Sequence, residues 1–279
     1  MAEIDARVAR RRFERAAATY ARAARLEAEI GARMLERLDY VRLAPRRVLD
    51  AGCGPGHWAR ALARRYRQAS VLALDFALPM LARGWLARLL PGARAPLAVC
   101  ADFARLPLAA ASVDLVWSNM ALHWAAEPQA VLAEFARVLA PGGLLMLSTL
   151  GPDTLKELRE AAGEARVHRF ADMHDIGDAL VACGFADPVM DMEHVTLTYA
   201  HAAAFLADLR ASGQTCAAPA RPRGLAGRDF RARLERALDA RRRGGRLHIT
   251  YEVVYGHGWK AAPRRTADGR DIVPLVRRR

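Results

Sequence analysis

The stretch at residues 47–56, RVLDAGCGPG, decides the fold, because a short apolar run there breaks into three glycines at alternate positions just before a helical pattern. Gly52, Gly54 and Gly56 have no Cβ, so the backbone can turn sharply from strand to helix and approach a ligand closely. The next apolar run, residues 71–74, ends at Asp75, whose carboxylate is placed to accept both hydroxyls of a ribose. Together these features predict a site for an adenosine-containing cofactor.

The spacing of the glycines separates two such cofactors. A dinucleotide fingerprint needs its third glycine three residues after the second, and His57 holds that position here. Asp50, two residues before the first glycine, would repel a pyrophosphate but can hold an ammonium group. The loop therefore favours S-adenosylmethionine over a dinucleotide, and it resembles the D-x-G-x-G-x-G loop of class I methyltransferases.

The composition is ordinary for a globular protein, with 279 residues of which 53% are hydrophobic and 26% charged. No apolar run approaches the roughly 18 residues that span a bilayer, and the N-terminal region lacks a secretory apolar segment. We therefore expect a cytoplasmic protein with no membrane partner. The four cysteines form no C-x-x-C pair, which indicates neither a zinc site nor a disulfide framework, and we expect no metal.

The net charge of +13 suggests an acidic partner, and most of the excess lies in residues 210–279. The basic residues are almost all arginine and alanine abounds, so the coding bias of a GC-rich genome is an equal explanation. We expect no nucleic-acid partner, because the chain lacks the interleaved basic and aromatic residues of the recognised modules.

Strands and helices alternate from residue 48 onward, which is typical of a parallel sheet with crossover helices. Residues 6–39 before them are helical in character, with an apolar face. Residues 247–253 alternate apolar and polar side chains, which predicts a last, antiparallel strand. The other expected strands are at 48–51, 71–75, 97–102, 113–119, 144–150 and 189–199. Other helices are expected after Gly56, at about 80–89, from Pro128, and after Asp153 or Thr154 as N-cap. Three more are expected from about residue 172, at about 201–211 and at about 228–243.

Five segments outside the cofactor loop carry a resemblance to one family. They are FERAAATY (13–20), WSNMALHW (117–124), STLGPDTL (148–155), HRFADMHDIGD (168–178) and ITYEVVYGH (249–257). These segments resemble the malonyl-[acyl-carrier protein] O-methyltransferases of the biotin pathway, and the resemblance runs from about residue 8 to 260. Two departures lie near the acceptor side: His123 stands where many members have glutamine, and the connection from Leu158 to His168 is short.

The resemblance implies a class I methyltransferase fold of the Rossmann-like α/β class, with a mostly parallel seven-stranded sheet, an antiparallel last strand and a helical N-terminal lid. The expected organisation is a lid at 1–44, a methyltransferase domain at 45–260 with an acceptor-side helical insert at about 153–185 and 201–243, and a disordered basic tail at 261–279. The implied reaction transfers a methyl group from S-adenosylmethionine to the free carboxylate of a malonyl thioester on acyl carrier protein, or on coenzyme A.

Cofactor-binding roles are expected along the carboxyl ends of successive strands. Asp50 and the three glycines would hold the methionine part, Asp75 the ribose, and Asp102 and Phe103 the adenine. Asn119 would face the methyl-transfer region. Met80 would pack near the ribose or adenine, with filling of the core as an equal alternative.

Acceptor-side roles are expected for three residues. Tyr20 in the N-terminal lid would hydrogen-bond the acceptor carboxylate, and His123 would orient the acceptor. Arg169 would bind the carboxylate or thioester region, because a guanidinium can hold carboxylate oxygens in a bidentate fork. The helix at 228–243 would bury Phe230, Leu234 and Leu238 and expose Arg231, Arg233, Arg236 and Arg241–Arg243, either as a docking surface for the carrier or as a solvated face.

Three alternatives remain open from the sequence. One is a methyltransferase of the same fold for another small acceptor. A second is a methyltransferase-like assembly factor of a respiratory complex, which the ALHW segment at 121–124 and the GWK segment at 258–260 also resemble. A dinucleotide oxidoreductase is the third, and His57 argues against it.

Overall fold

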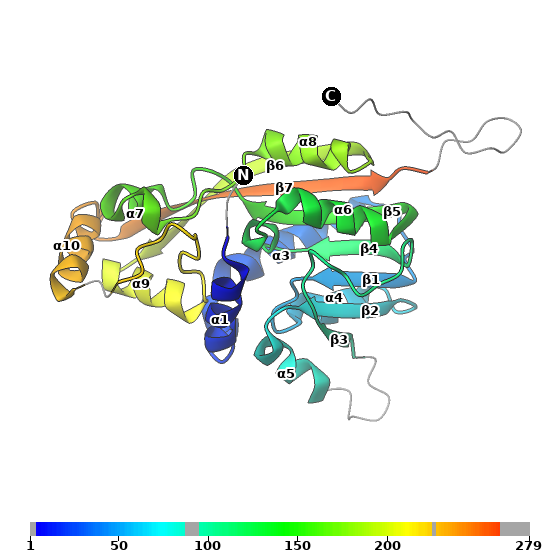
Figure 1. The fold of residues 1–279 in the computed structure, drawn as a ribbon, viewed down its shortest axis with the longest axis horizontal. Helices are drawn as coiled ribbons and strands as arrows, with labels where there is room; N and C mark the ends of the chain where they lie inside the picture. Colours follow the sequence, from blue (N-terminus) through cyan, green and yellow to red (C-terminus); the bar gives the residue numbers. More distant parts are fainter. Residues whose placement is uncertain (1–3, 87–94, 225–226, 263–279) are drawn as a thin grey trace, which may run out of the picture.

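The computed structural model describes residues 4–86, 95–224 and 227–262. Its core is a seven-stranded sheet of order β3-β2-β1-β4-β5-β7-β6, in which β7 is antiparallel to both neighbours and β1 to β5 pair in parallel (Figure 1). The expected sheet with an antiparallel last strand is confirmed. The strands are β1 (Arg47–Ala51), β2 (Ser70–Asp75), β3 (Leu97–Cys100), β4 (Val113–Ser118), β5 (Leu139–Leu150), β6 (Phe185–Tyr199) and β7 (Leu247–Lys260).

Helices cover both faces of this sheet. Alternate side chains of a strand point to opposite faces, so Val48 packs into the core under α3 and α4 while Leu49 packs into the core under α6 and α8. The helices are α1 (Ala6–Ala16), α2 (Tyr20–Ala23), α3 (Arg25–Arg37), η1 (Leu38–Tyr40), α4 (His57–Arg65), α5 (Leu78–Leu86), η3 (Leu122–Trp124), α6 (Pro128–Val138), α7 (Lys156–Ala162), η4 (Glu164–Arg166), α8 (Met173–Ala182), α9 (Ala202–Ala211) and α10 (Arg228–Asp239).

The N-terminal region is helical over 6–39, as predicted, but it is divided into separate helices and does not form one continuous run. The hydroxyl of Thr19 donates to the carbonyl of Ala16 at 3.0 Å and to that of Ala211 on α9 at 2.7 Å, which holds a turn between α1 and α2. A second break lies at Ala24, whose ψ of 55° is not helical. The N-terminal helices therefore follow a bent path that tertiary contacts fix.

Several element boundaries also differ from the sequence prediction. Helix α7 has Leu155, with φ 57°, at its N-cap instead of Asp153 or Thr154, because the Thr154 hydroxyl is bonded to the backbone of Glu252. Helix α10 ends at Asp239, so Arg241–Arg243 lie in the turn before β7. Strands β5 and β6 also begin earlier than expected, at Leu139 and Phe185. The expected helix end at 87–89 and most of the expected tail, 263–279, lie outside the described residues.

Helix α1 connects two parts of the molecule. It lies between the parallel strands and α9 (Figure 1), and the backbone N–H of Asp5 at its N-cap donates to the carbonyl of Ala217 at 2.9 Å. On its other side the Phe13 ring packs edge-on against Trp124, with ring centroids 4.9 Å apart. Residues on α1 therefore reach both the carboxyl end of β4 and the segment after α9.

Candidate functional site

The glycine loop after β1 adopts the sharp turn that its sequence predicts. Gly52, Gly54 and Gly56 have φ values of 78°, 52° and 74°, a region that side chains with a Cβ rarely adopt. At Gly52 an added Cβ would also lie 2.5 Å from the Cβ of Ala121, which follows β4. This glycine is therefore required by its backbone conformation and by the close approach of a neighbouring segment.

Two aspartates end the strands on either side of this loop. Asp50 on β1 is 1% exposed, and its Oδ2 has no hydrogen-bond partner among the described residues. Asp75 on β2 accepts hydrogen bonds from the backbone N–H groups of Gly54 and Ala77, both at 2.8 Å. Burial raises the pKa of Asp50 to about 8 and that of Asp75 to about 6. An unpaired buried carboxylate oxygen is a position that a bound cation would satisfy.

Tyr20 and Glu27 bring the N-terminal helices to the same place. The Tyr20 ring lies 3.5 Å from the position of a Cβ on Gly54, and burial raises the pKa of its hydroxyl well above the usual value, with Glu27 and Asp75 adding to the rise. Burial also raises the pKa of Glu27 to about 7. Asp50, Asp75 and Glu27, the carboxyl cluster, thus concentrate acidic groups beside the glycine loop. The ammonium and sulfonium groups of S-adenosylmethionine fit such surroundings.

The other residues expected to bind the cofactor differ in their burial and in their distance from the glycine loop. Phe103 reaches the glycine loop, with a ring carbon 3.9 Å from the position of a Cβ on Gly52. Asp102 is exposed, and its side chain accepts from the N–H of Ala104. Met80 is 2% exposed and packs with Phe13 and Trp124. Asn119 is buried, donates to the carbonyl of Glu27 at 2.8 Å and accepts from Ser148, so its amide joins β4 to α3.

A cavity of about 370 Å³ lies beyond the carboxyl ends of β4 and β5. Its walls come from α1, α7, α9, α10 and the segment after α9, and they include Leu150, Leu155, Leu209 and Leu234. The described residues that line it include no aspartate or glutamate. Five of the lining residues are arginines: Arg12, Arg166, Arg210, Arg221 and Arg231. We call it the arginine cavity. Its charge and apolar walls suit an anionic group attached to an apolar chain.

Two histidines in the wall of this cavity are neutral. Burial lowers the pKa of His123 to about 3 and that of His168 to about 4. His123 lies 3.4 Å from the Thr149 hydroxyl, and His168 accepts from the backbone N–H of Ala217. At neutral pH both rings therefore act as polar, uncharged parts of the wall.

The structure places Tyr20 on the glycine loop and His123 in the arginine cavity, but Arg169 lies elsewhere. Arg169 is exposed and does not line the cavity, whereas its neighbours His168 and Phe170 do. Arg12, Arg166, Arg210 and Arg221 were not among the candidates predicted from the sequence. The chain offers so many arginines that nothing in the sequence marks those whose side chains converge.

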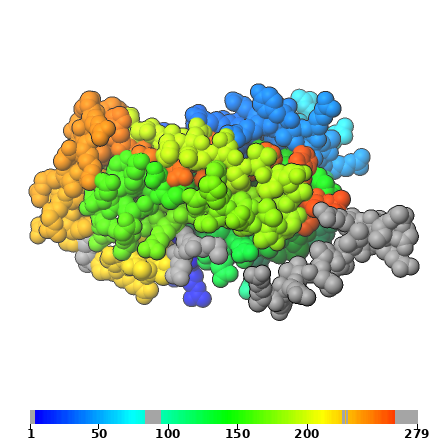
Figure 2. Space-filling model, turned by 90° about the horizontal axis from the view of Figure 1, so that it is seen from above, coloured from blue at the N-terminus to red at the C-terminus, as the bar shows by residue number. Residues whose placement is uncertain are grey.

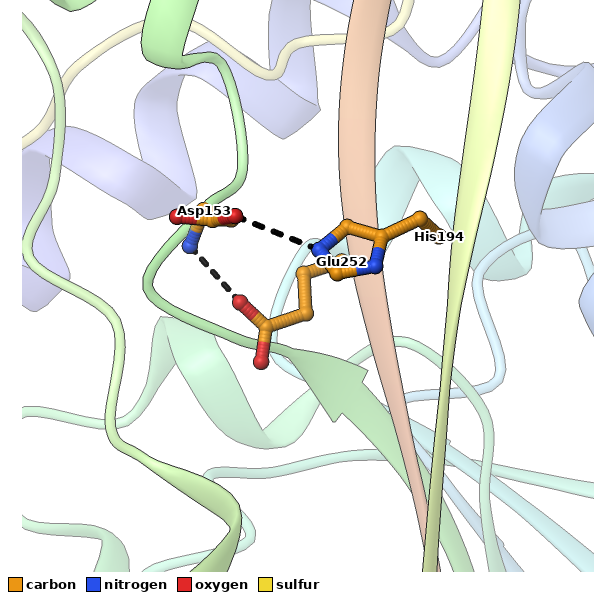
Figure 3. A group of neighbouring side chains, drawn as sticks. All are labelled: Asp153, His194 and Glu252. Carbon is orange, nitrogen blue, oxygen red and sulfur yellow. Dashed lines mark hydrogen bonds and ion pairs between the residues drawn. The ribbon is translucent and has the colours of Figure 1, made fainter.

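A separate group of polar side chains joins the loop after β5 to β6 and β7. Figure 3 shows Asp153 bonded to His194 at 3.3 Å and, through its backbone N–H, to Glu252 at 2.7 Å. Three such residues can hold a metal ion in other settings. Here the ammonium of Lys156 also lies 3.3 Å from Asp153, so a positive group already neutralises this carboxylate. We interpret the group as a structural link at the base of α7.

Comparisons with known proteins agree with this geometry. The family described as "Methyltransferase domain" matches residues 49–147. Malonyl-[acyl-carrier protein] O-methyltransferases are similar along nearly the whole chain: that of Methylovorus sp. (strain MP688) is 53% identical over 94% of this chain and 91% of its own length, and that of Laribacter hongkongensis (strain HLHK9) is 54% identical over 94% and 92%.

Solved structures share the fold at low identity. The YcgJ protein from Bacillus subtilis superposes with a TM-score of 0.59 at 17% identity, covering 82% of this chain and 98% of that one. Geranyl diphosphate C-methyltransferase from Streptomyces coelicolor A3(2), solved with S-adenosyl-L-homocysteine, gives a TM-score of 0.50 at 15% identity, covering 82% and 79%. Within the described residues, no helix is long and apolar enough to cross a membrane.

Proposed function

The chain belongs to the malonyl-[acyl-carrier protein] O-methyltransferase family, and from this premise we propose how its two sites divide the reaction. The carboxyl cluster and the glycine loop bind S-adenosylmethionine, and the arginine cavity receives the malonyl group of an acyl carrier protein. The product is the malonyl methyl ester, an early intermediate of biotin synthesis. The masking of a negative charge by the ester would let the acyl group enter elongation sites built for apolar chains.

The observation that carries this proposal is the opposite charge of two adjacent sites. Asp50 has an unpaired buried oxygen on the cofactor side, while the arginine cavity has five guanidinium groups and no carboxylate among its described lining residues. A cationic methyl donor and an anionic acceptor need this division of charge. A neutral acceptor would gain nothing from the arginines.

The residues need not remove a proton for this reaction. S-adenosylmethionine, when bound, supplies an electrophilic methyl group, and the acceptor carboxylate is already ionised at neutral pH, since carboxyl groups ordinarily have pKa values near 4. The remaining tasks are orientation and removal of water from the carboxylate oxygen, which together lower a barrier by several kcal/mol. Trp124 and Leu150 supply apolar walls, and the neutral His123 adds a hydrogen-bonding group without a competing charge.

The carrier protein would dock at the end of the molecule that holds the cavity. Figure 2 shows α10 in orange beside α7 in green and α9 in yellow at that end. The side chains of Leu234 and Leu238 are buried, whereas Arg231, Arg233 and Arg236 are exposed on α10. An acidic carrier would be drawn to this face by charge, and its acyl arm would then enter the cavity beside it.

The decisive experiment incubates the purified protein with S-adenosylmethionine and malonyl-acyl carrier protein and measures the intact mass of the carrier. We expect the carrier to gain one methyl group, and we expect no gain with the variant Asp75→Ala or with a succinyl carrier. Malonyl-coenzyme A in parallel shows how far the carrier itself contributes. An unmodified carrier, despite measurable cofactor binding, would favour another small acceptor or the assembly-factor alternative instead.

A further inference from the structure

Arg12 differs from the other arginines of the cavity in its surroundings. Arg210 and Arg231 are exposed, whereas Arg12 is half-buried, and its Nη1 donates to the backbone carbonyl of Cys216. Among the described residues, the nearby carboxylate of Asp5 pairs with Arg221 at 3.7 Å, and none forms an ion pair with Arg12. Burial and the charge of Arg221 lower the pKa of the Arg12 guanidinium. A cation so placed is costly unless an anion joins it.

The position of Arg12 lies at the inner end of the arginine cavity. The side chains of Arg12 and His168 both bond to the backbone at residues 216–217, so the two groups are close. The His168 ring packs edge-on against Trp124 with centroids 5.0 Å apart. Trp124 follows β4, near the glycine loop, whereas Arg166 lies over the Phe230 ring of α10, 3.9 Å from its centroid. Arg12 is therefore a guanidinium on the cofactor side of the cavity, and Arg166 is one on the α10 side.

Helix α1 also fixes Arg12 relative to the cofactor side. The next residue, Phe13, points about 100° away around the helix and packs against Trp124 and Phe76, the latter directly after Asp75. One turn of α1 thus holds an aromatic ring beside the carboxyl end of β2 and a guanidinium in the cavity.

We propose that Arg12 is the residue that binds the free carboxylate of the acceptor and positions it for methylation, in place of the exposed Arg169. The remaining N–H groups of its guanidinium hold one carboxylate oxygen and leave the other free to react. This inference rests on the proposed function, since it identifies the residue that recognises the malonyl group at that same site.

The test measures recognition of the carboxylate separately from turnover. With S-adenosylhomocysteine bound, so that no methyl transfer occurs, the dissociation constants of malonyl- and acetyl-acyl carrier protein are compared. Acetyl lacks the carboxylate, so we expect the wild-type protein to bind the malonyl carrier more tightly, and Arg12→Gln to reduce that ratio by about 10-fold or more. In turnover, the same variant should raise KM for the malonyl carrier while the affinity for S-adenosylhomocysteine is kept.

Arg11→Gln is the matched control, because it removes the same charge from an exposed position of the same helix. It should lower the affinity for both carriers equally and leave their ratio unchanged. Arg12→Lys keeps the charge but loses the planar fork, so we expect a smaller reduction of the ratio, and this variant decides alone if Arg12→Gln fails to bind S-adenosylhomocysteine. A wild-type ratio in the two Arg12 variants would overturn the role of Arg12. A wild-type protein that does not methylate the malonyl carrier would instead overturn the proposed function itself.

Discussion

The carboxyl cluster and the arginine cavity are two neighbouring sites of opposite charge. The carboxyl cluster consists of buried acids whose pKa values burial raises, and within the described part of the chain none of them forms an ion pair. The arginine cavity has five arginines, no lining acid among the described residues, and histidines whose pKa values burial lowers. Two of the cavity arginines pair with carboxylates outside the cavity, Arg221 with Asp5 and Arg231 with Glu235, whereas Arg12 forms no ion pair among the described residues. The difference indicates that the two sites suit ligands of opposite charge.

The largest expected effect is that of a substitution in the carboxyl cluster. Asp50→Asn removes the charge that faces the cofactor ammonium, so we expect affinity for S-adenosylhomocysteine to fall by about 30-fold or more, as for other truncated buried charge pairs. Isothermal titration calorimetry measures this loss. Asp178→Asn on the exposed side of α8 is the control and should bind normally. Equal affinity in the two variants would remove Asp50 from the cofactor site.

The second effect concerns the backbone of the glycine loop. Gly52→Ala places a Cβ at a positive φ and 2.5 Å from Ala121, so we expect the free energy of unfolding to fall by about 3 kcal/mol. Gly142→Ala has a similar φ of 75° but open space around it and should cost only about 1 to 2 kcal/mol. Urea unfolding compares the two variants. A Gly52→Ala cost no greater than the Gly142→Ala cost would mean that the close approach of Ala121 is unimportant.

A third effect distinguishes the sites by pH. Glu27 and Asp50 have folded-state pKa values of about 7 and 8, far above those of an unfolded chain, so the folded protein binds protons that the unfolded chain has lost. The free energy of unfolding of the unliganded protein should therefore fall as pH rises from 6.5 to 8.5, with a limiting slope of about 1.4 kcal/mol per pH unit for each such proton. Saturating S-adenosylhomocysteine should flatten this fall, because its ammonium favours the charged carboxylates.

The histidines of the arginine cavity change the free energy of unfolding with pH in the opposite direction. Their folded-state pKa values lie below those of an unfolded chain, so their contribution to stability is lost as pH falls below about 6.5. Thermal melting of the unliganded protein from below pH 6.5 to pH 8.5 measures the effects of the histidines and of the carboxyl cluster. A stability that rises steadily from pH 6.5 to 8.5 would contradict the assignment of buried protons to the carboxyl cluster.

The smallest expected effect tests whether the arginine cavity acts on the acceptor through its charge or through a proton transfer by His123. His123 is neutral at working pH, so His123→Gln preserves a neutral polar group, and we expect kcat/KM for the malonyl carrier to stay within about threefold of wild type. Steady-state kinetics from pH 6 to 9 measures this. A loss of 100-fold or more, of the size that removal of a general base causes, would show that His123 moves a proton.

The glycine loop and the strand ends beside it were readable from the sequence because their signals are local. The glycine loop spans a few consecutive residues, and strand alternation in an α/β sheet places Asp75 at the end of the next strand. The alternation of strands and helices predicted the parallel strands, and the alternation of apolar and polar side chains at 247–253 predicted β7. The breaks in the N-terminal helices were not readable, because the Thr19 hydroxyl finds its second acceptor on α9, 192 residues away.

The sequence by itself determined the fold class, the glycine loop and the family. Only the tertiary structure decided which arginines line the cavity, because the cavity is assembled from segments that include Arg12, Arg166 and Tyr251, far apart in the chain. His168 and Phe170 line the cavity whereas Arg169, between them, is exposed, so a difference of one residue separates the cavity wall from the solvent. Local geometry is encoded in consecutive residues, whereas the convergence of distant side chains depends on packing that no short stretch of sequence specifies.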